Sequence, residues 1–101
     1  MNIKIETLAL PMLAEALGGK RLEFEFAGAT VAELIAALKK SFGKKLEKAL
    51  FEHGAAKGIP YPVDPSIQIL INGRTWVNRD NLSTPLTEGS VVVFMLLAGG
   101  G

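Results

Sequence analysis

The stretch of this chain that most clearly suggests a chemical role is its last eleven residues, 91–101. They read Val-Val-Val-Phe-Met-Leu-Leu-Ala-Gly-Gly-Gly, so seven large apolar residues run directly into small ones. Packing alone does not account for a buried strand that ends in a segment almost without side chains. The pattern is typical of an arm that carries a terminal carboxylate, that of Gly101, into the active site of another protein.

The chemistry of such an arm follows from its residue types. A carboxylate is a poor acyl donor until one oxygen becomes a good leaving group, and adenylation achieves this. Glycine has no Cβ, so it can pass close to a partner's backbone. Residues 98–101 span about 13 Å when extended. We therefore expect Gly101 to carry the reacting carboxylate beside Gly100, with Ala98 and Gly99 contacting the partner. The alternative is that these glycines are a frayed end or a cloning remnant.

Other chemistry finds little support in the sequence. The chain has no cysteine, which removes disulfides, thiolate metal sites and a cysteine nucleophile. His53 is the sole histidine and has no ligand at metal-binding spacing. The sequence gives no support for hydrolase chemistry, because three serines have no plausible His/Asp pairing: Ser41, Ser83 and Ser90. We expect no metal, no bound cofactor and no catalytic centre within this chain.

Length and charge place the chain among small domains. The 101 residues are enough for one domain, predicted at residues 1–97, with residues 98–101 as a flexible glycine-rich tail. The 11 basic and 10 acidic residues nearly cancel, which argues against nucleic-acid binding. The chain begins in an alternating pattern without a signal peptide, and no apolar run approaches the roughly 20 residues of a membrane helix. We expect a cytoplasmic protein with no membrane partner.

The first half of the chain predicts two strands and a helix. Residues 2–8 alternate around Ile3 and Ile5, and residues 22–26 alternate again. A short helical turn between them starts at Pro11 and ends at Gly18-Gly19. Thr30 and Glu33 form a capping box. An apolar stripe at helical spacing follows and Gly43 ends it: Val31, Leu34, Ile35, Leu38 and Phe42.

The second half predicts a hairpin and a final strand. A second helix covers roughly residues 44–52, with Leu46, Ala49 and Leu50 inward, and residues 53–66 read as a loop. A strand at 67–71 leads into Asn72-Gly73, the favoured dipeptide of a two-residue type I′ hairpin. The return strand is centred on Trp76, a residue more often found in a core than in a site. Leu82 and Leu86 are expected at the core edge, before the final strand at 91–97.

This order predicts an α+β fold of the β-grasp type. It is a mixed sheet of four to five strands, with one main helix packed on one face and a short second helix. The last strand is apolar on both sides, so it should be central, parallel to the first strand. Val92 and Phe94 are expected in the core. The open face should carry a partner-binding stripe of Val93, Met95, Leu97 and Leu70, unless residues 53–66 fold over it.

The order resembles that of the MoaD/ThiS sulfur-carrier proteins, small relatives of ubiquitin. The resemblance covers most of the chain. It is carried by Ile69-Leu70-Ile71-Asn72-Gly73, by Val92 and Phe94, and by the Gly100-Gly101 end, with the approach Leu82…Thr84-Pro85-Leu86…Glu88-Gly89 between them. Leu96-Leu97 departs from the Pro-Pro often found before the tail of the molybdopterin carrier, and Gly99 and the long 53–66 connection depart as well.

The resemblance implies a carrier and not an enzyme. An E1-like enzyme would adenylate Gly101 with ATP, and a sulfur donor protein would supply the sulfur of a thiocarboxylate. The large subunit of molybdopterin synthase, or an equivalent, would receive it. Length favours molybdopterin biosynthesis, with thiamin thiazole or another metabolite as the alternative. Two other functions stay open, a ubiquitin-like modifier joined to lysines and a plain interaction module with an inert tail.

Overall fold

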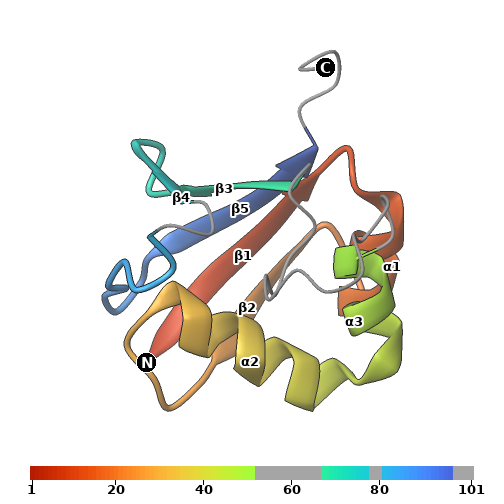
Figure 1. The fold of residues 1–101 in the computed structure, drawn as a ribbon, viewed down its shortest axis with the longest axis horizontal. Helices are drawn as coiled ribbons and strands as arrows, with labels where there is room; N and C mark the ends of the chain where they lie inside the picture. Colours follow the sequence, from red (N-terminus) through yellow and green to blue (C-terminus); the bar gives the residue numbers. More distant parts are fainter. Residues whose placement is uncertain (52–66, 78–80, 97–101) are drawn as a thin grey trace.

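The structure, a computed structural model, describes residues 1–51, 67–77 and 81–96. Within these ranges five strands form one mixed sheet in the order β2-β1-β5-β3-β4. Three helices in the same ranges lie on one side of this sheet (Figure 1). None of the helices in the described part of the chain combines the length and apolarity needed to cross a membrane.

The elements follow the predicted order closely. The strands are β1 (Asn2–Leu8), β2 (Arg21–Glu25), β3 (Ile67–Ile71), β4 (Thr75–Val77) and β5 (Val91–Leu96). The helices are α1 (Pro11–Leu17), α2 (Val31–Phe42) and α3 (Lys44–Phe51). The predicted strands, main helix and short helices are all present. The loop predicted at residues 53–66 lies outside the described residues.

The last strand is central, as its apolar sequence predicts. β5 pairs in parallel with β1 and antiparallel with β3, and β1 pairs antiparallel with β2. Successive side chains of a strand point to opposite sides of the sheet, and along residues 91–95 of β5 they alternate between half-buried and buried. Val92 is fully buried and Phe94 is 1% exposed, so both belong to the core, as expected.

The main helix begins at the predicted capping box. The Thr30 hydroxyl accepts from the backbone N–H of Glu33 at 3.3 Å. The Glu33 carboxylate accepts from the backbone N–H groups of Ala29 and Thr30 at 3.0 and 3.2 Å. These bonds favour the charged carboxylate: the Ala29 N–H contributes most, followed by the Thr30 side chain, and together they lower the pKa of Glu33. The cap fixes the start of the helix whose apolar stripe covers the sheet.

Two shorter helices complete the covered side. Pro11 begins α1, and Gly18 ends it at φ +86°, a left-handed conformation that glycine adopts without a steric penalty. Leu46 and Ala49 of α3 are buried, as predicted. Residues of all three helices join the strands in one core, which includes Ile3, Ile5, Leu13, Leu17, Val31, Leu34, Ile35, Leu38, Ile67, Ile69, Val77 and Leu86.

The β3–β4 hairpin differs from the prediction by one residue. Asn72 and Gly73 have positive φ (52° and 71°), and the Arg74 N–H donates to the Ile71 carbonyl at 3.1 Å, as the dipeptide predicts. However, the strands pair Ile71 with Thr75, so three residues and not two separate them. A register shift of one residue reverses the side of the sheet on which each side chain lies.

Candidate functional site

The described chain ends at the edge of the sheet where β1 also ends. β5 runs parallel to β1, and Met95 pairs with Leu8 near the end of both strands (Figure 1). The predicted site residues beyond this point lie outside the described residues: Leu97, Ala98, Gly99, Gly100 and Gly101. Their roles therefore stay predictions, and the structure places the strand that anchors them.

The side of the sheet opposite the helices, here called the open side, carries the other predicted partner-binding residues. Val93, Met95 and Leu70 are half-buried there. Val93 and Leu70 are direct cross-strand partners, so their side chains are neighbours on this side. Their orientation agrees with the prediction. Whether residues 53–66 cover them lies outside the described residues.

Two further apolar residues on the open side did not figure among the predicted partner-binding residues. Trp76 is 48% exposed and pairs with Leu70, while Leu8 is 53% exposed and pairs with Met95. Together these residues form a continuous set across four strands, here called the apolar patch: Leu8, Leu70, Trp76, Val93 and Met95. Large exposed apolar residues gathered in one place are typical of partner surfaces.

The expectation that Trp76 belongs to the core is wrong, and the hairpin register explains the error. A two-residue turn would pair Trp76 with Ile69, whose side chain is fully buried. The additional turn residue pairs Trp76 with Leu70 instead and gives the buried position to Val77. The position of Leu8 could have been predicted from the sequence. Alternate residues of a strand lie on the same side of the sheet, so Leu8 lies on the same side as Lys4 and Glu6.

The other half of the open side is charged. It consists of alternate residues of β1 and β2, here called the charged strip: Lys4, Glu6, Arg21, Glu23 and Glu25. Glu6 and Arg21 form a loose ion pair at 3.9 Å, with Arg21 largely exposed. Such surface pairs contribute little to stability. The strip therefore presents mostly exposed charges of both signs beside the apolar patch.

Ser90 and the acidic residues are among the described groups nearest in type to catalytic or metal-binding side chains. Ser90 is buried, and its hydroxyl accepts from the Thr87 N–H at 3.0 Å, so it serves the turn before β5. No group of three or more His, Cys, Asp or Glu side chains within the described ranges is arranged to hold a metal. His53 lies outside those ranges. The arrangement of the described residues is suited to binding another macromolecule.

Comparison with a known family covers most of the chain. The model of the ThiS family matches residues 12–101, which include the strands β2, β3, β4 and β5 and the terminal glycines. No protein in the curated sequences gives a significant match.

Solved structures show the same fold. The small archaeal modifier protein 1 (SAMP1) from Methanosarcina acetivorans is 27% identical, with a TM-score of 0.69 over 99% of this chain and 96% of that one. A putative molybdopterin converting factor, subunit 1, from Pyrococcus furiosus is 26% identical, with a TM-score of 0.60 over 95% and 97%. Mycobacterium tuberculosis CysO is 16% identical, with a TM-score of 0.68 over 95% and 99%. The five-stranded mixed sheet with its helices is thus the β-grasp fold of ubiquitin-like proteins.

Proposed function

Because this chain belongs to the ThiS family of ubiquitin-like carriers, we propose that it carries sulfur as a thiocarboxylate on Gly101. An E1-like partner would join the Gly101 carboxylate to AMP from ATP, with release of pyrophosphate. The outer sulfur of a persulfide on a sulfur donor protein would then attack the acyl carbon, and AMP would leave with one carboxylate oxygen. A thiol reductant would cleave the S–S bond of the resulting acyl disulfide, which leaves one sulfur in place of that oxygen as the thiocarboxylate. ATP belongs to the partner, and this chain is its substrate.

The observation that carries the proposal is the continuity between β5 and the glycine tail. β5 is fixed on one side by Val92 and Phe94, and on the other it contributes Val93 and Met95 to the apolar patch. A partner docked on that patch meets the tail as it leaves the sheet. Residues 97–101 then have a defined starting point, and glycine lets the last of them enter a narrow channel.

The proposed recipient of the sulfur rests on similarity to one solved structure and not on the family model. The Pyrococcus protein is a putative molybdopterin converting factor, subunit 1, and the 26% identity to it favours molybdopterin biosynthesis. In that case the large subunit of molybdopterin synthase would dock on the same patch. The thiazole of thiamin, or another sulfur-containing metabolite, is the alternative recipient. Genes adjacent to the one for this chain, if they encode a synthase large subunit or an adenylating enzyme, would decide between them.

The test uses the full chain, its adenylating enzyme, ATP and a sulfur donor. Intact mass spectrometry should show the gain expected for the exchange of one oxygen for sulfur, and the gain should disappear without ATP. Deletion of Gly100 and Gly101 should abolish it while the folded state, followed by circular dichroism, is unchanged. Glu25→Ala, a change at an exposed carboxylate of the charged strip, is the control for general effects of substitution. An unchanged mass with an active partner would contradict the proposal.

A second candidate function is protein modification. It is favoured by the match to a small archaeal modifier protein at 27% identity over nearly the whole of both chains. In this function the adenylated Gly101 would be joined to lysines of other proteins through an isopeptide bond. The last basic residue before Gly101 is Arg79, so trypsin would leave residues 80–101 attached to each target lysine. Detection of that branched peptide in cell extracts would support the modifier function, and its absence would favour the carrier alone.

A further inference from the structure

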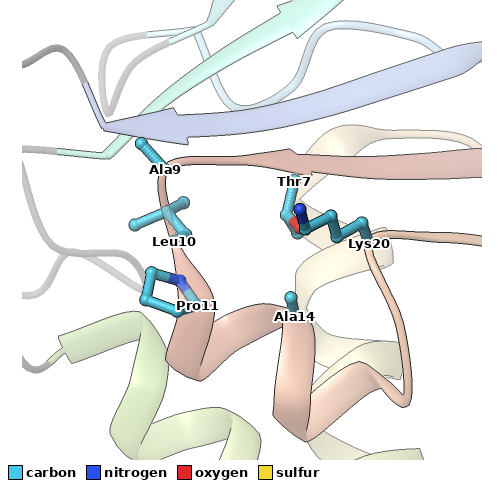
Figure 2. Close-up of a pocket in the computed structure, with 6 residues that line it drawn as sticks. All are labelled: Thr7, Ala9, Leu10, Pro11, Ala14 and Lys20. Carbon is cyan, nitrogen blue, oxygen red and sulfur yellow. The ribbon is translucent and has the colours of Figure 1, made fainter.

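A small hollow lies on the covered side of the sheet, near the edge where the described chain ends. Its volume is about 190 Å³. Figure 2 shows it between the end of β1, the start of α1 and the residue that precedes β2. The lining residues are Thr7, Ala9, Leu10, Pro11, Ala14 and Lys20.

Thr7 is a polar residue at a position of β1 where packing alone would favour an apolar one. It continues the inward parity of Ile3 and Ile5 and is only 5% exposed, yet it carries a hydroxyl. Its backbone N–H donates to the Lys20 carbonyl at 2.9 Å, but in the described part of the chain its hydroxyl has no hydrogen-bond partner. Ser90, the other buried polar residue of the described ranges, has a hydroxyl that accepts a hydrogen bond from the Thr87 N–H. An unpaired buried hydroxyl costs about 1–3 kcal/mol, so it is a candidate for binding a ligand.

Lys20 brings a positive charge to the same hollow. Its side chain extends along the hollow, with its ammonium turned toward the Thr7 hydroxyl (Figure 2). Lys45, by comparison, pairs with Glu15 at 3.1 Å. Within the described residues no carboxylate lies at ion-pair distance from Lys20. The hollow therefore presents a cation and a hydroxyl donor without an anion between them.

The walls restrict the chemistry of the ligand. The other four lining residues are apolar, so the hollow offers one charge and one hydroxyl within a mainly apolar surface. That donor set suits a singly charged carboxylate on a small stem better than a phosphate, whose oxygens need more donors. One water molecule occupies about 30 Å³ in the liquid. The hollow has room for a carboxylate and one or two glycine residues.

The terminal residues of this chain are within reach. Leu8, the partner of Met95, is followed directly by Ala9, which lines the hollow. Neighbouring strands lie about 4.8 Å apart, so β2 lies about 10 Å across the sheet from β5. Residues 97–101 span about 17 Å when extended. A tethered group of this kind has an effective concentration in the millimolar range, far above that of a free competitor.

We propose that the Thr7–Lys20 hollow binds the carboxylate of Gly101 in the free protein and competes with its entry into the adenylating partner. The inference rests on the proposed function, because it takes Gly101 as the terminal residue. It adds a resting position for the tail: the ammonium of Lys20 pairs with the carboxylate, and the Thr7 hydroxyl donates to it. Docking of a partner on the apolar patch would then capture the tail from this position.

The first experiment measures the pKa of the Gly101 carboxylate by NMR, from the pH dependence of the Gly101 amide signal in the full chain. Lys20→Met should raise this pKa by roughly 0.2–0.7 units, because an exposed ion pair is lost. Thr7→Val should raise it by less. Lys40→Met, which removes an exposed charge on α2, is the matched control and should leave it unchanged. Equal pKa values in the wild type and in Lys20→Met would overturn the proposal.

A second experiment at neutral pH covers the case in which a variant folds poorly. The full chain is compared with the same chain carrying a C-terminal amide in place of the carboxylate. The amide signals of Thr7, Ala14 and Lys20 should shift, and that of Leu70 on the open side should not. Addition of acetate to the amidated chain should reverse the shifts. If acetate binds but amidation has no effect, the hollow accepts carboxylates from another source and the tail is not its occupant.

These measurements separate this inference from the proposed function. A chain that gains sulfur but shows no effect of amidation is a carrier without this resting position. A chain whose tail binds the hollow but gains no sulfur has the contact without the proposed chemistry.

Discussion

The two sides of the sheet are built from alternate residues of the same strands, and they differ in what covers them. On the covered side, β5 contributes Val92 and Phe94, at most 1% exposed under the helices. On the open side, the same strand contributes Val93 and Met95, which are half-buried. Both sets are apolar. Burial in the core therefore explains why Val92 and Phe94 are apolar. Val93 and Met95 are apolar although no described element covers them.

The open side also differs within itself. The half formed by β1 and β2 carries the charged strip, which is what a solvent-facing antiparallel sheet normally shows. The half formed by β5, β3 and β4 carries most of the apolar patch, with Trp76 at the edge strand. Tryptophan is enriched among the residues that dominate binding energy at interfaces. The contrast shows that burial in the core explains one side of the sheet, whereas half of the other side carries apolar residues that no described element covers.

The largest expected effect comes from the covered side. Phe94→Ala removes a ring that is 1% exposed and should lower the free energy of unfolding by about 3–5 kcal/mol, because it leaves a cavity in the core. Small domains have only about 5–15 kcal/mol in total, so much of the protein would unfold at elevated temperature. Urea denaturation followed by circular dichroism measures the change. Val93→Ala, the adjacent residue on the open side, is the matched control and should cost much less. Equal losses would show that the two sides are not distinct.

The next effect tests the open side. Trp76→Ala should weaken binding to the adenylating partner by about 2 kcal/mol or more, roughly 30-fold in Kd, because it removes a large half-exposed anchor. The change in unfolding free energy should be about 1 kcal/mol or less, as for most surface substitutions. Isothermal titration calorimetry measures the binding, with Glu25→Ala as the control on the charged strip.

The neighbour of Trp76 offers the inverse control. Val77 is 1% exposed and faces the core, so Val77→Ala should reduce stability and leave the affinity of the folded protein for the partner nearly unchanged. If Trp76→Ala leaves the affinity for the partner unchanged, the β4 edge of the apolar patch is not part of the docking surface.

The sequence predicts the covered side well because several local signals agree there. The alternation around Ile3 and Ile5, the capping box at Thr30 and the apolar run of β5 each fix one element, and the topology follows from where their apolar residues can be buried together. Val92 and Phe94 could be assigned to the core from parity alone. These features depend on residues close together in the chain.

The open side is harder to predict because it depends on register. Asn72-Gly73 correctly predicts positive φ at both residues, but not the additional residue before β4. That one residue moves Trp76 from the core to the apolar patch. The Thr7–Lys20 hollow is harder still, because its two polar residues are thirteen positions apart. They meet only through the antiparallel pairing of β1 with the residue before β2, and α1 must then pack beside them to form the wall.

A smaller effect is expected from the cap of the covering helix. Thr30→Ala removes the hydroxyl that accepts from the Glu33 N–H and should destabilise the protein by about 1 kcal/mol. Thr30→Ser keeps an acceptor at this position and should recover most of the loss. Thermal denaturation of the two variants measures the difference. Affinity of the folded protein for the partner should not change, since Thr30 caps α2, which lies on the side of the sheet opposite the apolar patch. Loss of affinity in Thr30→Ala would mean that the two sides are coupled.

The smallest effect is a pH dependence confined to the same cap. The hydrogen bonds from Ala29 and Thr30 lower the pKa of Glu33 below its ordinary value of 4.5. The folded state therefore binds this proton more weakly than the unfolded state. The resulting stabilisation is fully present above the unfolded pKa and is lost as the pH falls through the folded pKa. Glu33→Gln should be less stable than the wild type at neutral pH, and the gap should close as the pH falls well below 4.5. Urea denaturation across this pH range measures the difference in stability.

Glu25→Gln, at an exposed carboxylate without a hydrogen-bond partner in the described residues, controls for loss of charge. A gap that persists at low pH would mean that the negative charge of Glu33 is not the source of the stabilisation.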